Sequence, residues 1–144
     1  MKRNMRTWID SVLQSRKRLA IPVMTHPGIA LRGNTVLATV TNPRLHFEAV
    51  QAVAQTYPTG ASTMIMDLSV EAQAFGAEVR FGDNEVPSVV GRCVDDAASI
   101  DRLAVPGLDE ARVGQWIEAS QLAAQTISDR PVLAGCIGPF SLAA

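Results

Sequence analysis

The chain of 144 residues is poor in cysteine and in aromatic side chains, and it has no long apolar run. Cys93 and Cys136 lie far apart without Cys-x-x-Cys spacing, so we expect free thiols and no disulfide framework. No segment approaches the roughly 20 apolar residues of a membrane-spanning helix, and the first residues lack the apolar core of a signal peptide. These absences predict a cytoplasmic protein that does not enter a membrane.

The chain also lacks an excess of charge of either sign. Charged residues make up 19% of the chain, hydrophobic residues 47%, and the formal net charge is -1, which is typical of an ordinary globular protein. Six of the 13 basic residues lie within residues 1–18. That basic start is compatible with nucleic acid or an acidic lipid surface, but a solvated outer helix explains it more simply. Because no broad basic field and no aromatic stacking motif is present, we expect no nucleic-acid partner.

Helical and extended patterns alternate along the chain. The first residues predict an N-terminal amphipathic helix whose apolar stripe packs inward. Its apolar residues recur at helical spacing: Met5, Trp8, Ile9, Val12 and Leu13. Apolar runs at 19–24, 62–66 and 131–136 predict three buried strands, with residues 25–28 as the loop after the first. Helices are predicted from residue 43 to just before Pro58, after an Asn cap, and from about residue 109 to 127.

Two shorter features lie between the second and third predicted strands. Gly82-Asp83-Asn84 is typical of a turn, and the segments beside it predict a β-hairpin over residues 78–90, with Pro87 suited to an edge strand. Asp95 or Asp96 is a suitable cap for a helix that reaches about residue 103. We therefore expect one α/β domain with an inserted hairpin.

Asp67 is the first candidate for chemistry because it directly follows the apolar run Met64-Ile65-Met66. A carboxylate at the end of a buried strand suits an acid, a base or an anchor for a ligand N–H, whereas its structural alternative is a cap for the next helix. If the three strands are parallel neighbours, His26, Asp67 and Cys136 converge on one rim. The Gly-x-x-Gly at 135–138 predicts close packing of strand and helix rather than a phosphate loop.

Three blocks in order carry a family resemblance: residues 21–28 (IPVMTHPG), 67–76 (DLSVEAQAFG) and 131–143 (PVLAGCIGPFSLA). Together they resemble the N-terminal part of the uroporphyrinogen decarboxylase superfamily. The resemblance implies an incomplete (β/α)8 TIM barrel, with its first three strands, an N-terminal helix and the inserted hairpin. A closed barrel takes about 250 residues, so residues 1–144 would form the N-terminal portion of one such domain and would be inactive alone.

The same resemblance implies which residues form the site. Asp67 matches the family's catalytic aspartate, and His26, Gly28, Glu71, Gln73 and Cys136 are the expected substrate-binding residues. No close spacing of His, Cys or acidic residues supports a metal site among them.

The details of the motifs favour one branch of the family. Thr25 and Ile29 stand where the decarboxylases carry two carboxylate-binding arginines, and Glu71 stands where they tend to have proline. The sequence of these motifs is more similar to that of the methylcobalamin:coenzyme M methyltransferases. This similarity implies corrinoid-dependent methyl transfer to a thiol. Zinc and a corrinoid are then expected only for a full-length enzyme, whose zinc ligands would follow residue 144.

The sequence is also compatible with other functions and with several partners. The alternatives are a uroporphyrinogen carboxy-lyase and a truncated, non-catalytic chain that binds a tetrapyrrole or a partner. The expected partners are a corrinoid protein or a tetrapyrrole, together with the missing C-terminal barrel half or a second copy of the chain.

Overall fold

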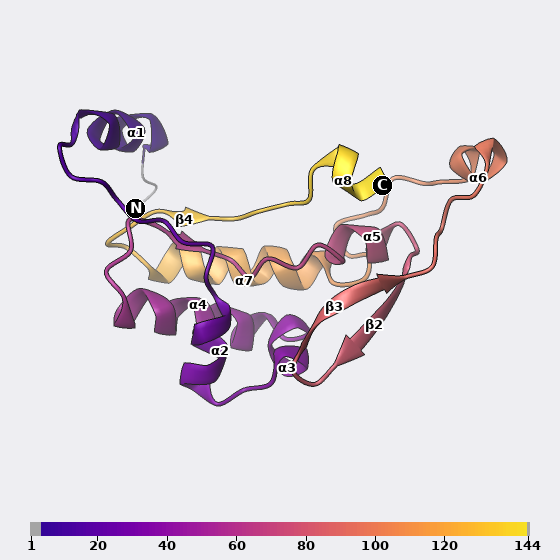
Figure 1. Cartoon of the computed structure of the whole chain (residues 1–144), viewed down its shortest axis with the longest axis horizontal. Helices are drawn as coiled ribbons and strands as arrows, with labels where there is room; N and C mark the ends of the chain where they lie inside the picture. Colours follow the sequence, from indigo (N-terminus) through magenta and orange to yellow (C-terminus); the bar gives the residue numbers. More distant parts are fainter. Residues whose placement is uncertain (1–3, 144) are drawn as a thin grey trace.

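Two short parallel strands run through the middle of the molecule (Figure 1). In this computed structural model, which describes residues 4–143, β1 (Ser62–Thr63) pairs with β4 (Val132–Leu133). The ladder extends on both sides, because the N–H of Ser62 donates to Pro131 O at 2.9 Å and the N–H of Met64 to Leu133 O at 3.3 Å. The predicted second and third strands are therefore parallel neighbours, although shorter than expected. Lys2 and Arg3 of the basic start lie outside the described residues.

The first predicted strand is extended but is not a regular strand, so that prediction was wrong in detail. Residues 19–24 run beside β1 in the same direction, with Gly60 N–H donating to Ala20 O at 2.8 Å and the Thr63 hydroxyl donating to Pro22 O at 3.3 Å. Proline has no N–H to give to a ladder, so Pro22 interrupts regular pairing here.

Helices α4 (Pro43–Thr56) and α7 (Val113–Thr126) pack together along one side of the strands. The N-cap Asn42 accepts hydrogen bonds from the N–H groups of Arg44 and Leu45, as its sequence predicts. Helix α7 begins four residues later than predicted, because residues 109–112 form turns. The core between these helices and β1 contains Phe47, Val50, Ala54, Met64, Ala119, Ala123 and Ile127.

The segment predicted as a loop after the first strand is instead helical, which corrects the expectation for residues 25–28. Helix α2 (His26–Arg32) begins directly after Thr25, and α3 (Val36–Val40) follows after a turn at Gly33. Both pack on α4. Gly28 makes the α2 contact possible, because a Cβ placed there would lie 2.1 Å from the carbonyl oxygen of Ala49.

The predicted hairpin is confirmed as β2 (Glu78–Gly82) and β3 (Glu85–Val90), which pair antiparallel. It packs against α3, and Leu37 N–H donates to Asp83 O in the turn at 3.1 Å. Pro87 is buried within β3. Helix α5 (Val70–Ala74) precedes the hairpin, and Gly76, with φ of 96°, follows its end. Helix α6 (Ala97–Asp101) carries the predicted Asp96 cap, and α8 is Pro139–Ala143.

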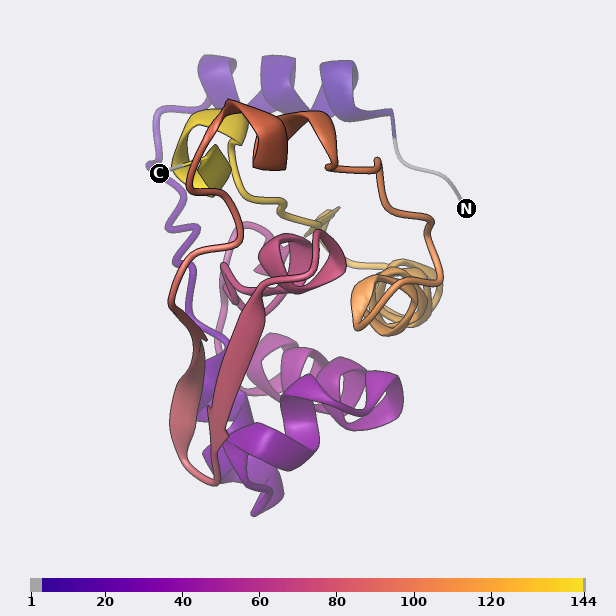
Figure 2. The same cartoon turned by 90° about the vertical axis from the view of Figure 1, so that its right-hand side faces the viewer.

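Helix α1 (Met5–Gln14) forms where its sequence predicts, but it does not pack inward. It contains no buried residue, and Met5, Ile9 and Leu13 are exposed. Figure 2 shows α1, α6 and α8 on one side of the strands, with α2, α3 and α4 on the other. Within residues 4–143, no helix is long and apolar enough to cross a membrane.

Candidate functional site

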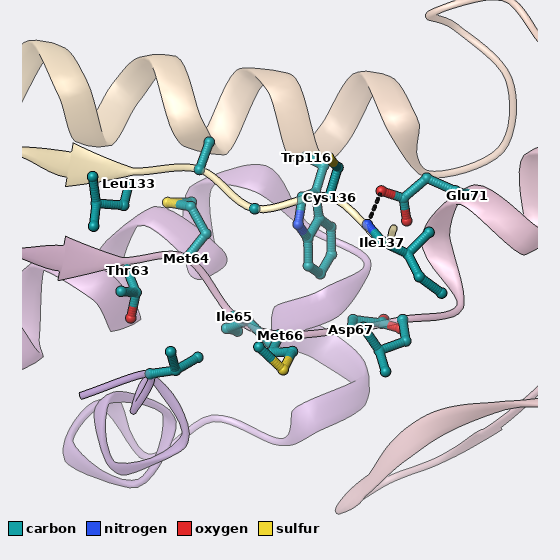
Figure 3. A pocket seen from close by; sticks show the side chains of 14 residues that line it. Thr63, Met64, Ile65, Met66, Asp67, Glu71, Trp116, Leu133, Cys136 and Ile137 are labelled. Atoms are coloured by element: carbon teal, nitrogen blue, oxygen red, sulfur yellow. Dashed lines mark hydrogen bonds between the residues drawn. The ribbon is translucent and has the colours of Figure 1, made fainter. Parts of the chain in front are cut away.

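A cavity of about 240 Å³ lies where the chain leaves the carboxyl ends of β1 and β4 (Figure 3). Its walls come from two segments, residues 63–68 and 133–137, joined by Glu71 and Trp116 of the neighbouring helices and by Val23. The lining is mainly aliphatic, aromatic and thioether in character. Its ionisable side chains are those of Asp67, Glu71 and Cys136, and neither lysine nor arginine lines it. Such a surface suits the edge of an apolar ligand better than a polyanion.

Asp67 forms a buried ion pair beneath this cavity. Its Oδ2 lies 2.6 Å from Nη1 of Arg112, and the two side chains are 0% and 5% exposed. Oδ1 accepts hydrogen bonds from the backbone N–H and the hydroxyl of Ser69, at 2.9 and 2.6 Å. Both carboxylate oxygens are thus occupied by donors. The N-cap residue of α5 is Ser69, so Asp67 is not the N-cap of this helix.

The guanidinium of Arg112 is surrounded by hydrogen-bond acceptors and aromatic rings. Its Nη2 donates to the Ser69 hydroxyl at 2.8 Å and its Nε donates to Oε1 of Gln73 at 2.7 Å. The rings of Phe81 and Trp116 lie 4.9 and 5.9 Å from the central carbon, within reach of cation–π attraction. This network joins the end of β1, α5, the hairpin and the start of α7 into one unit.

Arg112 is a site residue that the sequence did not predict, because its local sequence gives little signal. Residues 109–112 (DEAR) are typical of a solvated charged stretch, and the partner carboxylate lies 45 residues away. Ala111 adopts a left-handed backbone with φ of 48°, directly before Arg112 enters α7 as its N-cap residue. A non-glycine residue in that region carries a small conformational cost, which the buried network offsets.

Glu71 of α5 is hydrogen-bonded to the segment 133–137, which forms the other wall of the cavity. Its Oε1 accepts a hydrogen bond from the backbone N–H of Ile137 at 3.0 Å, as Figure 3 shows. This bond fixes the loop that carries Cys136, whose thiol is free and exposed. The predicted close packing at the Gly-x-x-Gly motif was wrong, because a Cβ on Gly135 or Gly138 would meet no atom within 4 Å.

The structure gathers only some of the predicted site residues. Asp67, Glu71 and Cys136 line the cavity together. His26 is exposed in the first turn of α2, Gly28 is buried against α4, and Gln73 is bound to Arg112, so these three lie outside the lining. Among residues 4–143, no group of three or more His, Cys, Asp or Glu side chains is arranged to hold a metal ion.

His46 is a second buried titratable group that the sequence did not predict. Its Nε2 accepts a hydrogen bond from Ile65 N–H at 3.0 Å, and its ring meets that of Trp116 edge-on at 4.4 Å. Burial lowers the pKa of His46 from 6.5 to about 4, while the charge of Asp67 opposes this shift. A neutral ring therefore supports the backbone two residues before Asp67.

Acidification is expected to destabilise the protein through His46. Below about pH 6.5 the unfolded chain protonates this ring, whereas the folded chain resists protonation down to about pH 4. Stability consequently falls as the pH decreases, by about 2 kcal/mol between pH 7 and pH 5. Urea unfolding at the two pH values measures the loss. In His46→Gln, whose amide oxygen can accept the same hydrogen bond, the pH-dependent loss should shrink by that amount. An unchanged pH dependence in this variant would contradict the assignment.

Comparisons with known proteins place these features in a family context. The family model described as uroporphyrinogen decarboxylase (URO-D) matches residues 18–144. A methylcobamide:CoM methyltransferase, MtbA, of Methanosarcina acetivorans is 34% identical over 79 residues, and MtbA of Methanosarcina mazei is 33% identical over the same length. Each match covers 54% of this chain and 23% of the relative. The relatives are thus much longer than the matched segment.

A solved structure has a similar fold. A methyltransferase from Methanosarcina mazei superposes with a TM-score of 0.81 at 22% sequence identity. The superposition covers 98% of this chain and 44% of that structure. The arrangement of β1, β4 and their helices therefore corresponds to slightly less than half of a larger α/β protein.

Proposed function

The chain belongs to the uroporphyrinogen decarboxylase family, and we propose that it forms one wall of a corrinoid-facing site for methyl transfer to a thiol. The proposal draws on the two methylcobamide:CoM methyltransferases that its sequence resembles. Because the chain covers 44% of the similar methyltransferase structure, we assign to it only the part that its own residues form.

The observation that carries the proposal is the chemistry of the cavity lining. Its walls are apolar and contain two acids and no cation, which supports the edge of a corrin ring as the ligand. A porphyrinogen with several carboxylates needs cationic partners. Thr25 and Ile29 do not supply them, because neither side chain carries a charge. Both are also buried, and the Thr25 hydroxyl donates a hydrogen bond to Thr63 O. The carboxy-lyase alternative therefore receives less support.

Each site residue has a distinct part in this proposal. Asp67 supplies a fixed negative charge that Arg112 compensates, and it holds the end of β1 in place. Glu71 orients the Cys136 loop through Ile137, and the apolar residues exclude water from the ligand's edge. A bound corrinoid would supply the methyl group. The described residues do not form a zinc site.

Equilibrium dialysis with cyanocobalamin tests the proposal directly. We expect saturable binding to the chain of residues 1–144. Ala134→Phe, which fills the cavity from an exposed position, should weaken binding at least about tenfold, a loss of roughly 1.4 kcal/mol. Ala30→Phe changes an exposed alanine on α2 outside the lining, so it should bind as the wild type does. Absence of saturable binding, or equal weakening by both substitutions, would contradict the proposal.

A further inference from the structure

The two carboxylates that line the cavity of Figure 3 differ in what their oxygens can still bind. In Asp67, Oδ1 accepts two hydrogen bonds and Oδ2 is paired with Arg112, and the side chain is 0% exposed. In Glu71, Oε1 accepts the N–H of Ile137 at 3.0 Å, whereas Oε2 has no partner among the described residues. Glu71 is therefore the carboxylate that can still accept a hydrogen bond from a ligand.

The hydrogen bond to Ile137 holds the free oxygen of Glu71 at the cavity. Glu71 belongs to α5 and Ile137 to the segment that follows β4, so the bond joins a helix to the opposite wall. Figure 3 shows the second oxygen of Glu71 at the edge of the cavity, with no hydrogen bond drawn to it. A carboxylate whose direction one hydrogen bond already fixes loses little freedom when its other oxygen binds a ligand. Glu71 is thus a preorganised acceptor.

The charge of Glu71 has no cation beside it in the cavity. Arg112 is paired with Asp67, and neither lysine nor arginine lines the cavity. The lining is mainly apolar, so the charge of Glu71 is screened less than a charge on an open surface. A ligand carboxylate at this position would face a like charge, whereas a neutral N–H group would form a charge-assisted hydrogen bond. The cavity therefore discriminates between these two groups.

We propose that Glu71 determines ligand specificity by accepting a hydrogen bond from a primary amide at the rim of the corrin ring. The inference rests on the proposed corrinoid-facing function and names the group of the corrinoid that this chain recognises. A corrin ring carries its polar groups as side chains around its rim, and in cobalamin these include primary amides. A corrinoid with a carboxylate in place of the recognised amide is rejected, because Glu71 repels that charge and no lysine or arginine of the lining pairs with it.

Equilibrium dialysis of residues 1–144 at about pH 7.5, where carboxylates are ionised, tests this inference with matched ligands. The probes are cyanocobalamin and its monocarboxylic acids, each made by hydrolysing one propionamide. At least one acid should bind at least about tenfold more weakly than cyanocobalamin. The methyl ester of that acid is neutral but has no N–H, so it should bind more weakly than the amide by roughly fivefold or more. The N-methylamide carries the same added methyl group and keeps an N–H, so it should bind within about threefold of cyanocobalamin.

Glu71→Gln separates this role from a purely structural one. The new amide oxygen can still accept the Ile137 N–H, while the amide nitrogen offers a donor in place of Oε2. The preference for cyanocobalamin over the weakly bound acid should therefore fall from at least about tenfold to about threefold or less. Glu118→Gln removes the same charge from an exposed glutamate of α7 outside the lining, so it should leave the preference unchanged. Circular dichroism confirms that both variants are folded.

The outcomes distinguish this inference from the proposed function. Absence of saturable cyanocobalamin binding overturns both. If cyanocobalamin binds but every acid binds equally well, or the methyl ester binds as well as the N-methylamide, only the role of Glu71 is overturned. A preference that Glu71→Gln leaves unchanged, or that Glu118→Gln lowers equally, overturns that role too. The ligand series needs the wild type alone, so it decides the question whether or not Glu71→Gln folds.

Discussion

Asp67→Asn is expected to lower the free energy of unfolding by about 3 to 5 kcal/mol. The substitution keeps the size of the side chain but removes the charge opposite Arg112, whose guanidinium is buried 2.6 Å away. An unpaired cation in that position is poorly solvated, because the Arg112 side chain is only 5% exposed and Phe81 and Trp116 flank its central carbon. Urea unfolding of the wild type and the variant measures the loss.

Asp129→Asn is a matched control that distinguishes the effect of a buried ion pair from that of an exposed one. Asp129 and Arg130 form an ion pair at the same distance of 2.6 Å, but the Asp129 side chain is 63% exposed. Asp129→Asn should therefore cost less than about 1 kcal/mol. The double variant Asp67→Asn/Arg112→Met removes both charges and should be less destabilised than the sum of its single substitutions. Equal small losses in Asp67→Asn and Asp129→Asn would contradict the buried-pair account.

Gly28→Ala is expected to destabilise the protein by about 3 kcal/mol, the upper end of the usual overpacking cost. The added methyl group would lie 2.1 Å from the carbonyl oxygen of Ala49 and 2.9 Å from a methyl group of Val53. Backbone cannot move aside as a side chain does, so α2 and α4 must separate and open the core around Ile29. Thermal and urea unfolding measure the effect.

Gly135→Ala is the control for that substitution. It adds the same methyl group to a glycine of the cavity loop, where no atom lies within 4 Å and the backbone φ is not positive. Its stability should stay within about 0.5 kcal/mol of the wild type. An equally small loss of stability in Gly28→Ala would contradict the close contact between α2 and α4.

Local sequence signals predicted the elements whose causes are local. The Asn42 and Asp96 caps and the 78–90 hairpin depend on neighbouring residues, and each is found where its signal lies. The place of Asp67 at the end of a buried run was predictable for the same reason. Its partner Arg112 was not, because the pair joins residues 45 apart and nothing in the charged run before α7 distinguishes a buried arginine from a solvated one.

The remaining differences between the sequence-based predictions and the structure depend on contacts between elements that are distant in the sequence. The stripe on α1 predicts an amphipathic helix correctly, but the periodicity does not say whether another surface covers it, and here Met5, Ile9 and Leu13 stay exposed. At Gly28 the sequence indicated a turn, whereas the reason for glycine is a contact with α4. His46 belongs to the same class, because its neutral form depends on burial against Trp116.

Alkylation of the two cysteines tests the proposed ligand-facing cavity most directly. Cys136 lines the cavity and Cys93 does not, and both thiols are free and exposed. Mass spectrometry after a timed reaction with N-ethylmaleimide gives the rate at each residue, with and without saturating cyanocobalamin. We expect the corrinoid to slow modification of Cys136 several-fold and to leave Cys93 unchanged. Equal rates at Cys136 with and without the corrinoid would contradict the assignment of this cavity as a corrinoid-facing site.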